Sequence, residues 1–383
     1  MKKHEFRAIT FSIFAGNRRK MSSTCRSRKL QIITFRYFII LSLLFFVLLN
    51  GCKSNDDTPD VSNIKISLQT WRFDKDLYAI DTNHIADGLK KLLVKYPDFL
   101  NYYLDTIREY GIHGNYNDTV KGIREDLKID LTFKDFKDLE DTIFRYYPDS
   151  RETDATLTTA FRFMKYYFPD YAVPRIIYLN MGLSKWPTFP VDTTTYCIGL
   201  DMFLGDQFPH YRSVGIPAYM NAHLRKSYIP VSLFSTIYRT MHPFMSDDQT
   251  LLELMIQRGK EQYFLHKILP HTPDSVLFGF TELQLKWCSE NEAFIYNFFI
   301  HQKLLFNKEG RNTIPYVNDG PFAKDMEAPT DTIKTTPGNI GTWLGYRIVS
   351  AYMSKHPETT LPMLLQSRMD AAKLLEEAKY RPK

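Results

Sequence analysis

The chain of 383 residues contains little cysteine and little glycine, with 4 Cys and 17 Gly. It has no CxxC pair and no Cys/His cluster with the spacing of a metal site, which excludes the common zinc-finger and redox motifs. HExxH, GxSxG, a Walker A sequence and GxGxxG are also missing. The sequence therefore offers no local catalytic motif, and it predicts neither a metal nor a cofactor.

Long hydrophobic runs are also lacking. The longest one, Tyr37–Leu49, has 13 residues and is interrupted only by Ser42. A helix that spans a bilayer needs roughly 20 residues, whereas a run of this length after a positively charged segment is typical of a signal peptide. We therefore expect export from the cytoplasm.

A lipid attachment site follows this run directly. The sequence Leu49-Asn50-Gly51-Cys52 resembles a bacterial lipobox, in which the Cys thiol is acylated, and a polar stretch comes after it. The sequence predicts a lipoprotein signal peptide over residues 1–51, lipid on Cys52, and a polar tether over 52–62. Residues 1–20 could be an extension from a misassigned start, with Met21 as the true one. The alternative is an ordinary Cys52 beside an uncleaved signal anchor.

The net charge of the whole chain is +6, and this excess of positive charge comes from the leader. Residues 1–51 hold ten Lys/Arg and one acid, so the remaining 332 residues carry 39 basic and 42 acidic side chains, a net charge of −3. A nucleic-acid-binding protein needs its basic excess on the folded domain, so no nucleic-acid partner is expected. Two or more acyl chains would instead hold the protein stably on a membrane.

Residues 63–383 are predicted to form one predominantly helical α+β domain. Apolar side chains alternate along residues 63–73, which indicates a strand, and further strands are expected at 175–180 and 195–198. Helical periodicity predicts the remaining elements, among them 251–268, 281–305 and 339–355. The helix over 281–305 is apolar on most faces, so we expect it to be the central buried helix.

Several short motifs in this domain resemble the gliding motility lipoprotein GldB family of Bacteroidota. They occur in the family's order and cover nearly the whole mature chain: Trp71-Arg72-Phe73-Asp74-Lys75-Asp76-Leu77-Tyr78, Lys95-Tyr96-Pro97-Asp98-Phe99, Gly199-Leu200-Asp201-Met202-Phe203-Leu204-Gly205, Met255-Ile256 with Gly259-Lys260, Glu290-Asn291-Glu292, and Pro337-Gly338-Asn339-Ile340-Gly341-Thr342-Trp343-Leu344-Gly345. The resemblance implies an envelope lipoprotein that is needed for gliding and for the linked type IX secretion system.

The same layout is similar to putative secreted zinc peptidases of the zincin type. In those proteins one helix carries HExxH, and the next supplies an acidic ligand just before a Gly. The matching stretch here is Tyr238-Arg239-Thr240-Met241-His242, in which only His242 could bind a metal, and Arg258 precedes Gly259. The resemblance implies a zincin-like scaffold that has lost its zinc.

Four residues are candidates for a binding groove on this scaffold. His242 ends a predicted helix, where a histidine commonly caps terminal carbonyls, or it could be a remnant ligand. Glu290, Asn291 and Glu292 interrupt an apolar helix and could line a cleft, or they could form a satisfied polar network.

Three further features bear on packing. Gly338, Gly341 and Gly345 share one helical face, which favours the close approach of another backbone. The alternating charges from Arg72 to Asp76 suggest a solvated strand edge, or a partner-binding edge beside the tether. Cys197 and Cys288 could be bridged or could be buried free thiols.

We therefore expect a non-catalytic lipoprotein of the cell envelope, on the outer membrane and on either face of it. It would support the assembly or stability of the gliding and type IX secretion machinery, with other envelope proteins of that machinery as partners. Two alternatives stay open. One is an envelope peptidase-like hydrolase with an atypical site, and the other is a peptide- or glycan-binding module that uses the degenerate groove.

Overall fold

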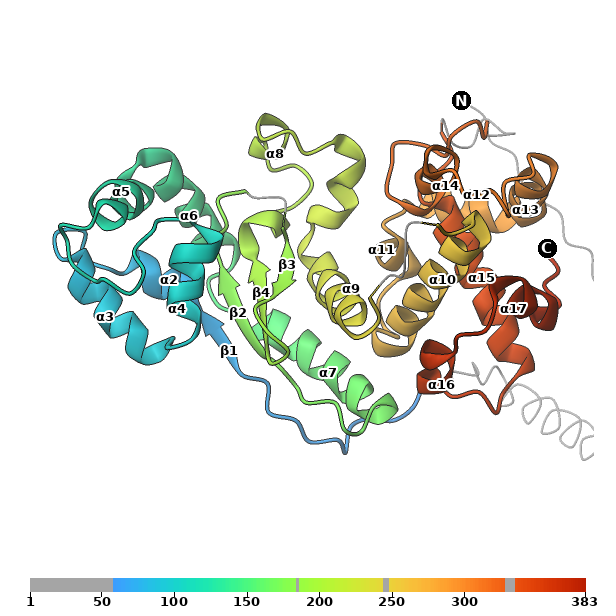
Figure 1. Cartoon of the computed structure of the whole chain (residues 1–383), viewed down its shortest axis with the longest axis horizontal. Helices are drawn as coiled ribbons and strands as arrows, with labels where there is room; N and C mark the ends of the chain where they lie inside the picture. The colour runs from blue at the N-terminus through green and yellow to red at the C-terminus, as the bar shows by residue number, and fades with distance from the viewer. Residues whose placement is uncertain (1–57, 184–185, 244–247, 328–334) are drawn as a thin grey trace, which may run out of the picture. The chain divides into compact units, whose positions relative to one another are not determined.

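A four-stranded mixed sheet is the centre of the fold (Figure 1). Its strands are β1 (Thr70–Arg72), β2 (Arg175–Leu179), β3 (Thr188–Pro190) and β4 (Thr195–Gly199), in the order β1-β2-β4-β3. The pairs β1/β2 and β2/β4 are parallel, whereas β3 runs antiparallel to β4 at one edge. The computed structural model describes residues 58–183, 186–243, 248–327 and 335–383, so the predicted signal peptide and Cys52 lie outside the described residues.

The two faces of the sheet belong to two different hydrophobic cores. Ile176 and Tyr178 of β2 face the larger core, and Ile177 and Leu179 face the smaller one. Successive side chains of a strand point to opposite faces, so β2 must be apolar at each of its buried positions, Ile176 to Leu179, to be buried on both. This requirement explains why the sequence of β2 shows no alternation.

The smaller core is covered by the first helices of the chain (Figure 1). Phe73, at the start of α2, packs edge-on against Tyr96, Phe99 and Tyr103, with ring centroids 4.7–5.0 Å apart. The helical elements around this core are α2 (Phe73–Tyr78), α3 (Ile85–Lys95), α4 (Phe99–Asn101), the π-helical turns Tyr102–Ile107 and Gly122–Leu127, and α5 (Lys128–Thr132). The next helix, α6 (Lys134–Tyr146), contributes Ile143 to the larger core.

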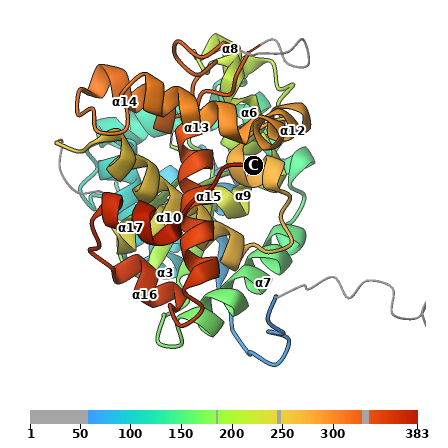
Figure 2. The same ribbon diagram turned by 90° about the vertical axis from the view of Figure 1, so that its right-hand side faces the viewer.

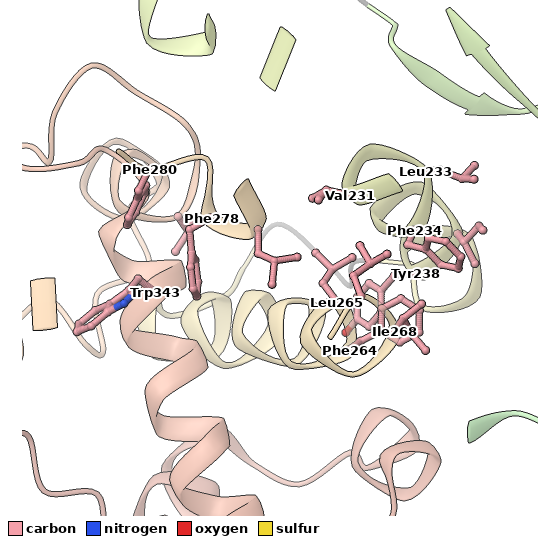
Figure 3. Close-up of a cluster of buried hydrophobic side chains, with 14 of the residues drawn as sticks. Val231, Leu233, Phe234, Tyr238, Phe264, Leu265, Ile268, Phe278, Phe280 and Trp343 are labelled. Carbon is pink, nitrogen blue, oxygen red and sulfur yellow. The ribbon is translucent and has the colours of Figure 1, made fainter. Parts of the chain in front are cut away.

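The larger core surrounds α10 (Leu251–Ile268), which is buried on most sides. Phe264, Leu265 and Ile268 of α10 face α9 (Ile229–Met241), whereas Phe278, Phe280 and Trp343 lie on the opposite side, towards α15 (Ile340–Lys355) (Figure 3). The remaining elements are α7 (Arg151–Tyr167), α8 (His210–Ser213), α11 (Asp274–Phe278), α12 (Glu282–Glu290), α13 (Glu292–His301), α14 (Gly310–Val317), α16 (Leu361–Gln366), α17 (Ala371–Ala378), and the 3-10 turns Leu200–Phe203, Ala218–Leu224 and Lys226–Tyr228.

Helices α10 and α15 cross at two glycines. A Cβ atom on Gly345 would lie 1.9 Å from the carbonyl oxygen of Met255, and one on Gly259 would lie 2.4 Å from the backbone of Gly345. Gly341 likewise faces the backbone of Tyr316. The predicted backbone contact is therefore confirmed. Figure 2 shows α15 running between α13 on one side and α16 on the other.

The helical prediction for 281–305 was wrong in two respects. The segment forms two helices, because α12 ends at Glu290 and α13 begins at Glu292. It is also not the central helix, since Leu283 and Phe294 are exposed and α10 and α15 occupy the middle of the core.

The predicted strand over 63–73 is mostly unpaired chain. Ile64, Ile66 and Leu68 pack against the larger core, but only residues 70–72 join the sheet, and α2 starts at Phe73. A solvated edge was also the wrong expectation for Arg72 and Asp74. Asp74 is buried and accepts hydrogen bonds from the Arg72 guanidinium, at 2.8 Å from Nε to Oδ1.

Cys197 and Cys288 are both buried free thiols, and burial raises the pKa of each. In the part of the chain that the structure describes, no helix has the length and hydropathy to cross a membrane. The mostly helical composition with one small sheet confirms the α+β class.

Candidate functional site

A cleft of about 560 Å³ opens between strand β3, helix α9 and residues 215–228. Its volume lies within the roughly 300–1,000 Å³ that is usual for ligand pockets. Apolar, hydroxyl-bearing and charged side chains all contribute to its lining. The lining residues are Trp186, Pro187, Thr188, Met202, Gly215, Ile216, Pro217, Tyr219, Met220, His223, Leu224, Tyr228, Ser232, Ser235, Thr236, Arg239 and Asp319.

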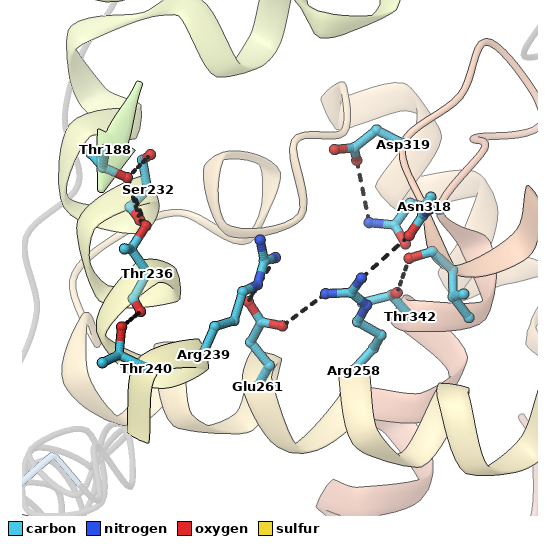
Figure 4. A network of polar contacts seen from close by, with 12 residues as sticks. Thr188, Ser232, Thr236, Arg239, Thr240, Arg258, Glu261, Asn318, Asp319 and Thr342 are labelled. Atoms are coloured by element: carbon cyan, nitrogen blue, oxygen red, sulfur yellow. Dashed lines mark hydrogen bonds and ion pairs between the residues drawn. The ribbon is translucent and has the colours of Figure 1, made fainter. Parts of the chain in front are cut away.

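A row of hydroxyl groups joins β3 to α9 along one side of the cleft (Figure 4). Ser232, Thr236 and Thr240 are spaced four residues apart, so they share one face of α9. The Oγ1 atom of Thr188 lies 2.8 Å from Ser232 Oγ and 2.7 Å from Thr236 Oγ1. This row fixes the edge strand on the helix through side-chain contacts.

Two arginines share one buried glutamate at the next position along the cleft (Figure 4). Arg239 of α9 donates through Nε to Glu261 Oε1 at 3.0 Å, and Arg258 of α10 donates through Nη1 to Oε2 at 3.2 Å. The Glu261 side chain is 3% exposed. Burial lowers the pKa of Arg258, and the carboxylate of Glu261 opposes that shift.

His223 and Asp319 separate the cleft from a second cavity of about 270 Å³. Nδ1 of His223 lies 3.6 Å from Asp319 Oδ2, and its ring stacks on Tyr228 with centroids 4.4 Å apart. Burial lowers the pKa of His223, although the Asp319 carboxylate opposes this. The burial disfavours the charged imidazolium, and the other charged side chains on the cleft lining, Arg239 and Asp319, have opposite signs.

His242 occupies the C-cap position of α9, as the sequence predicts. Its backbone N–H donates to the carbonyl of Tyr238 at 2.8 Å, and the two rings lie 5.2 Å apart. Burial, with a smaller contribution from the charge of Lys260, lowers the pKa of His242 and so disfavours the protonated form that would interact favourably with the helix dipole. Nε2 is buried and has no hydrogen-bond partner among the described residues.

None of the four predicted groove residues, His242, Glu290, Asn291 and Glu292, is part of the cleft lining, so that prediction was wrong for this cleft. Glu292 is buried and accepts hydrogen bonds from Arg347 at 3.0 and 3.1 Å and from the Tyr380 hydroxyl. Asn291 donates to the carbonyl of Trp287 at 2.9 Å, and Glu290 is an exposed residue 3.8 Å from Lys286. The satisfied polar network is therefore the interpretation that the structure supports for Glu292.

The donor chemistry at the zincin-like positions does not suit a zinc ion. Tyr238 and His242 lie side by side as the i and i+4 positions of the motif, but arginines stand at 239 and 258 and engage Glu261. A guanidinium cannot ligate a cation. Within the described ranges, no three His, Cys, Asp or Glu side chains form a group that could hold a metal.

Sequence reasoning missed Glu261, Thr188, His223 and Asp319. For Glu261 a signal was present, because it follows Arg258 by three residues and therefore lies on the same helical face. Thr188 lies between Pro187 and Pro190. Two prolines so close together are typical of a loop, so the sequence does not predict the short edge strand found there.

A model of the gliding motility protein GldB family matches residues 54–382. The chain belongs to this family. The match spans the described domain from tether to C-terminus and confirms the resemblance carried by the short motifs. The family label denotes lipoproteins, so the chain is a membrane-anchored envelope protein with a part in gliding motility. Comparisons with curated proteins and with solved structures find no significant match.

Proposed function

We propose that this protein is a non-catalytic outer-membrane lipoprotein that supports the assembly or stability of the gliding and type IX secretion machinery. Acyl chains on Cys52 would anchor it, and the folded domain would contact envelope partners of that machinery. The scaffold is a zincin-like one without its metal. The observation that carries the non-catalytic part is the Arg239–Glu261–Arg258 network, which occupies the positions where the base and a ligand would stand.

The peptidase-like alternative has weaker support. General acid–base chemistry needs a group that can both reach a bound substrate and exchange a proton. Glu292 is held by Arg347 and Tyr380, and Glu290 lies outside the cleft lining. The cleft does contain an imidazole, His223, but its neighbours Asp319 and Tyr228 hold it in a buried stack.

A gene deletion in the parent bacterium tests the proposed role. We expect loss of colony spreading, or of secreted type IX cargo in a non-motile strain, and restoration by the full chain. A Cys52→Ala chain should fail to restore either property because it lacks the lipid anchor, whereas Cys288→Ala, at a buried free thiol, should restore both. A deletion that changes neither spreading nor the secreted proteins would overturn the proposal.

A further inference from the structure

The free edge of strand β3 offers main-chain hydrogen bonds to the cleft. Gly199 donates to the carbonyl of Pro187, and Val191 donates to the carbonyl of Thr195, both at 2.9 Å. Main-chain groups alternate in direction along an antiparallel strand, so those of Thr188 and Pro190 point away from β4. No other described strand pairs with that edge.

The unpaired groups form a short and asymmetric recognition unit. Thr188 presents both an N–H and a carbonyl, whereas Pro190 presents only a carbonyl, because proline has no N–H. A proline on an edge strand limits pairing to a short stretch and so prevents continuous sheet growth. Thr188 also lines the cleft, which places this strand edge beside the cavity.

The rest of the cleft suits a neutral and partly apolar ligand. Its charged side chains, Arg239 and Asp319, have opposite signs, so no net charge selects an acidic or a basic ligand. Trp186 is 67% exposed and Tyr219 is 40% exposed, both at the cleft. Exposed aromatic rings beside a main-chain edge can hold the side chains of a chain that pairs with that edge.

We propose that an extended peptide segment of a partner protein binds this cleft by adding a short strand to β3. The peptide backbone would exchange hydrogen bonds with Thr188, and an apolar side chain would lie against Trp186. This inference rests on the proposed function, because it names the kind of contact by which a non-catalytic lipoprotein would hold its partner. A glycan is the competing occupant, but it would make no use of the strand edge.

The first test uses synthetic peptides and needs no protein variant. A linear dodecapeptide selected from a phage-displayed random library is labelled with fluorescein, and its binding to the full-length protein in detergent is measured by anisotropy. N-methylation at alternate positions removes the N–H groups on one edge of the peptide. We expect one of the two methylated registers to weaken binding about tenfold or more, and the other to have little effect.

Two substitutions of Thr188 test whether the peptide contacts the main chain of β3 at this residue. Thr188→Pro removes the outward N–H but leaves the ladder to β4 intact, and it should weaken binding about tenfold. Thr188→Ala loses the same hydroxyl but keeps the N–H, so it is the matched control, and Thr188→Pro should bind about tenfold more weakly than Thr188→Ala. If Thr188→Pro does not fold, the methylated peptides still decide the question.

Three results would overturn the inference: no linear peptide is selected, both methylated registers bind as tightly as the parent, or a tetramer of N-acetylglucosamine saturates the cleft and Trp186→Ala abolishes that binding. None of these would affect the proposed non-catalytic role. Cleavage of the bound peptide, detected by mass spectrometry, would instead contradict the non-catalytic role but would not contradict the peptide-binding site.

Discussion

The carboxylate of Glu261 balances the charges of the two arginines beside the cleft, Arg239 and Arg258. Its carboxylate contacts two guanidinium groups, and Arg258 is largely buried with it. Removing one partner of a buried ion pair leaves an uncompensated charge that water cannot solvate, which is strongly destabilising. The role of Glu261 is therefore structural support of the cleft wall.

The variant Glu261→Gln tests this role. It keeps the shape and an acceptor oxygen but loses the charge, and we expect the free energy of unfolding to fall by about 3 kcal/mol. Glu290→Gln is the matched control, since an exposed pair such as Glu290–Lys286 is worth at most about 1 kcal/mol. Urea denaturation of both variants measures the difference, and equal stabilities would refute the structural role.

At the level of single residues, the sequence predicted where a residue lies in a helix better than it predicted which side chains the residue contacts. His242 does end its helix, because apolar periodicity and Pro243 mark that end clearly. The burial of Glu292 could not be predicted, because its partners Arg347 and Tyr380 are distant in sequence and only the folded chain brings them together. Arg72 is two residues from Asp74, yet a local pair of this kind is equally typical of a solvated surface.

At the level of elements, the crossing of α10 and α15 depends on the absence of two side chains. Gly259 and Gly345 allow the backbones to touch, and the resulting approach is too close for a methyl group on either helix. The spacing of the glycines in the sequence indicated such a contact, although it could not identify α10 as the partner.

Gly345→Ala should therefore destabilise the protein by about 3 kcal/mol or more, since the added Cβ meets backbone that cannot move alone. Gly310→Ala is the control, because there the Cβ meets only the flexible end of the Ile314 side chain at 3.2 Å. Thermal denaturation followed by circular dichroism compares the two, and a harmless Gly345→Ala would mean that the helices do not cross so closely.

Elements that depend on distant contacts escaped the sequence analysis. The segment 281–305 is apolar on most faces of a single continuous helix, and that pattern does not show that the chain breaks at Asn291. Strand β3 has only three residues, one of them a proline, and it exists because β4 and the hydroxyl row of α9 hold it in place.

At the level of the whole molecule, stability should depend on pH through Glu140. The side chain is buried, Oε2 accepts from Asn180 at 2.8 Å, and Oε1 has no partner among the described residues. Burial, together with the charge of Asp74, raises the pKa of Glu140 to about 8. In the unfolded chain the same carboxyl has a pKa of about 4.3.

Because the folded pKa is the higher one, ionisation favours the unfolded chain. The stability linked to Glu140 is complete below about pH 4 and is lost as the pH rises towards 8. Glu140→Gln should therefore raise the free energy of unfolding at pH 8, on the order of 2 kcal/mol relative to its effect at pH 5. Denaturant titrations at the two pH values check this, and an unchanged difference would contradict it.

The central proposal is that a scaffold resembling the zincins works here without a metal. Elemental analysis tests it most directly, on protein purified in detergent without a His tag or chelators, beside the variant Tyr238→His/Arg258→Glu that restores a ligand set with His242. The account predicts no stoichiometric zinc in the wild-type chain and about one zinc per chain in the folded variant. One zinc per wild-type chain that survives dialysis would contradict it.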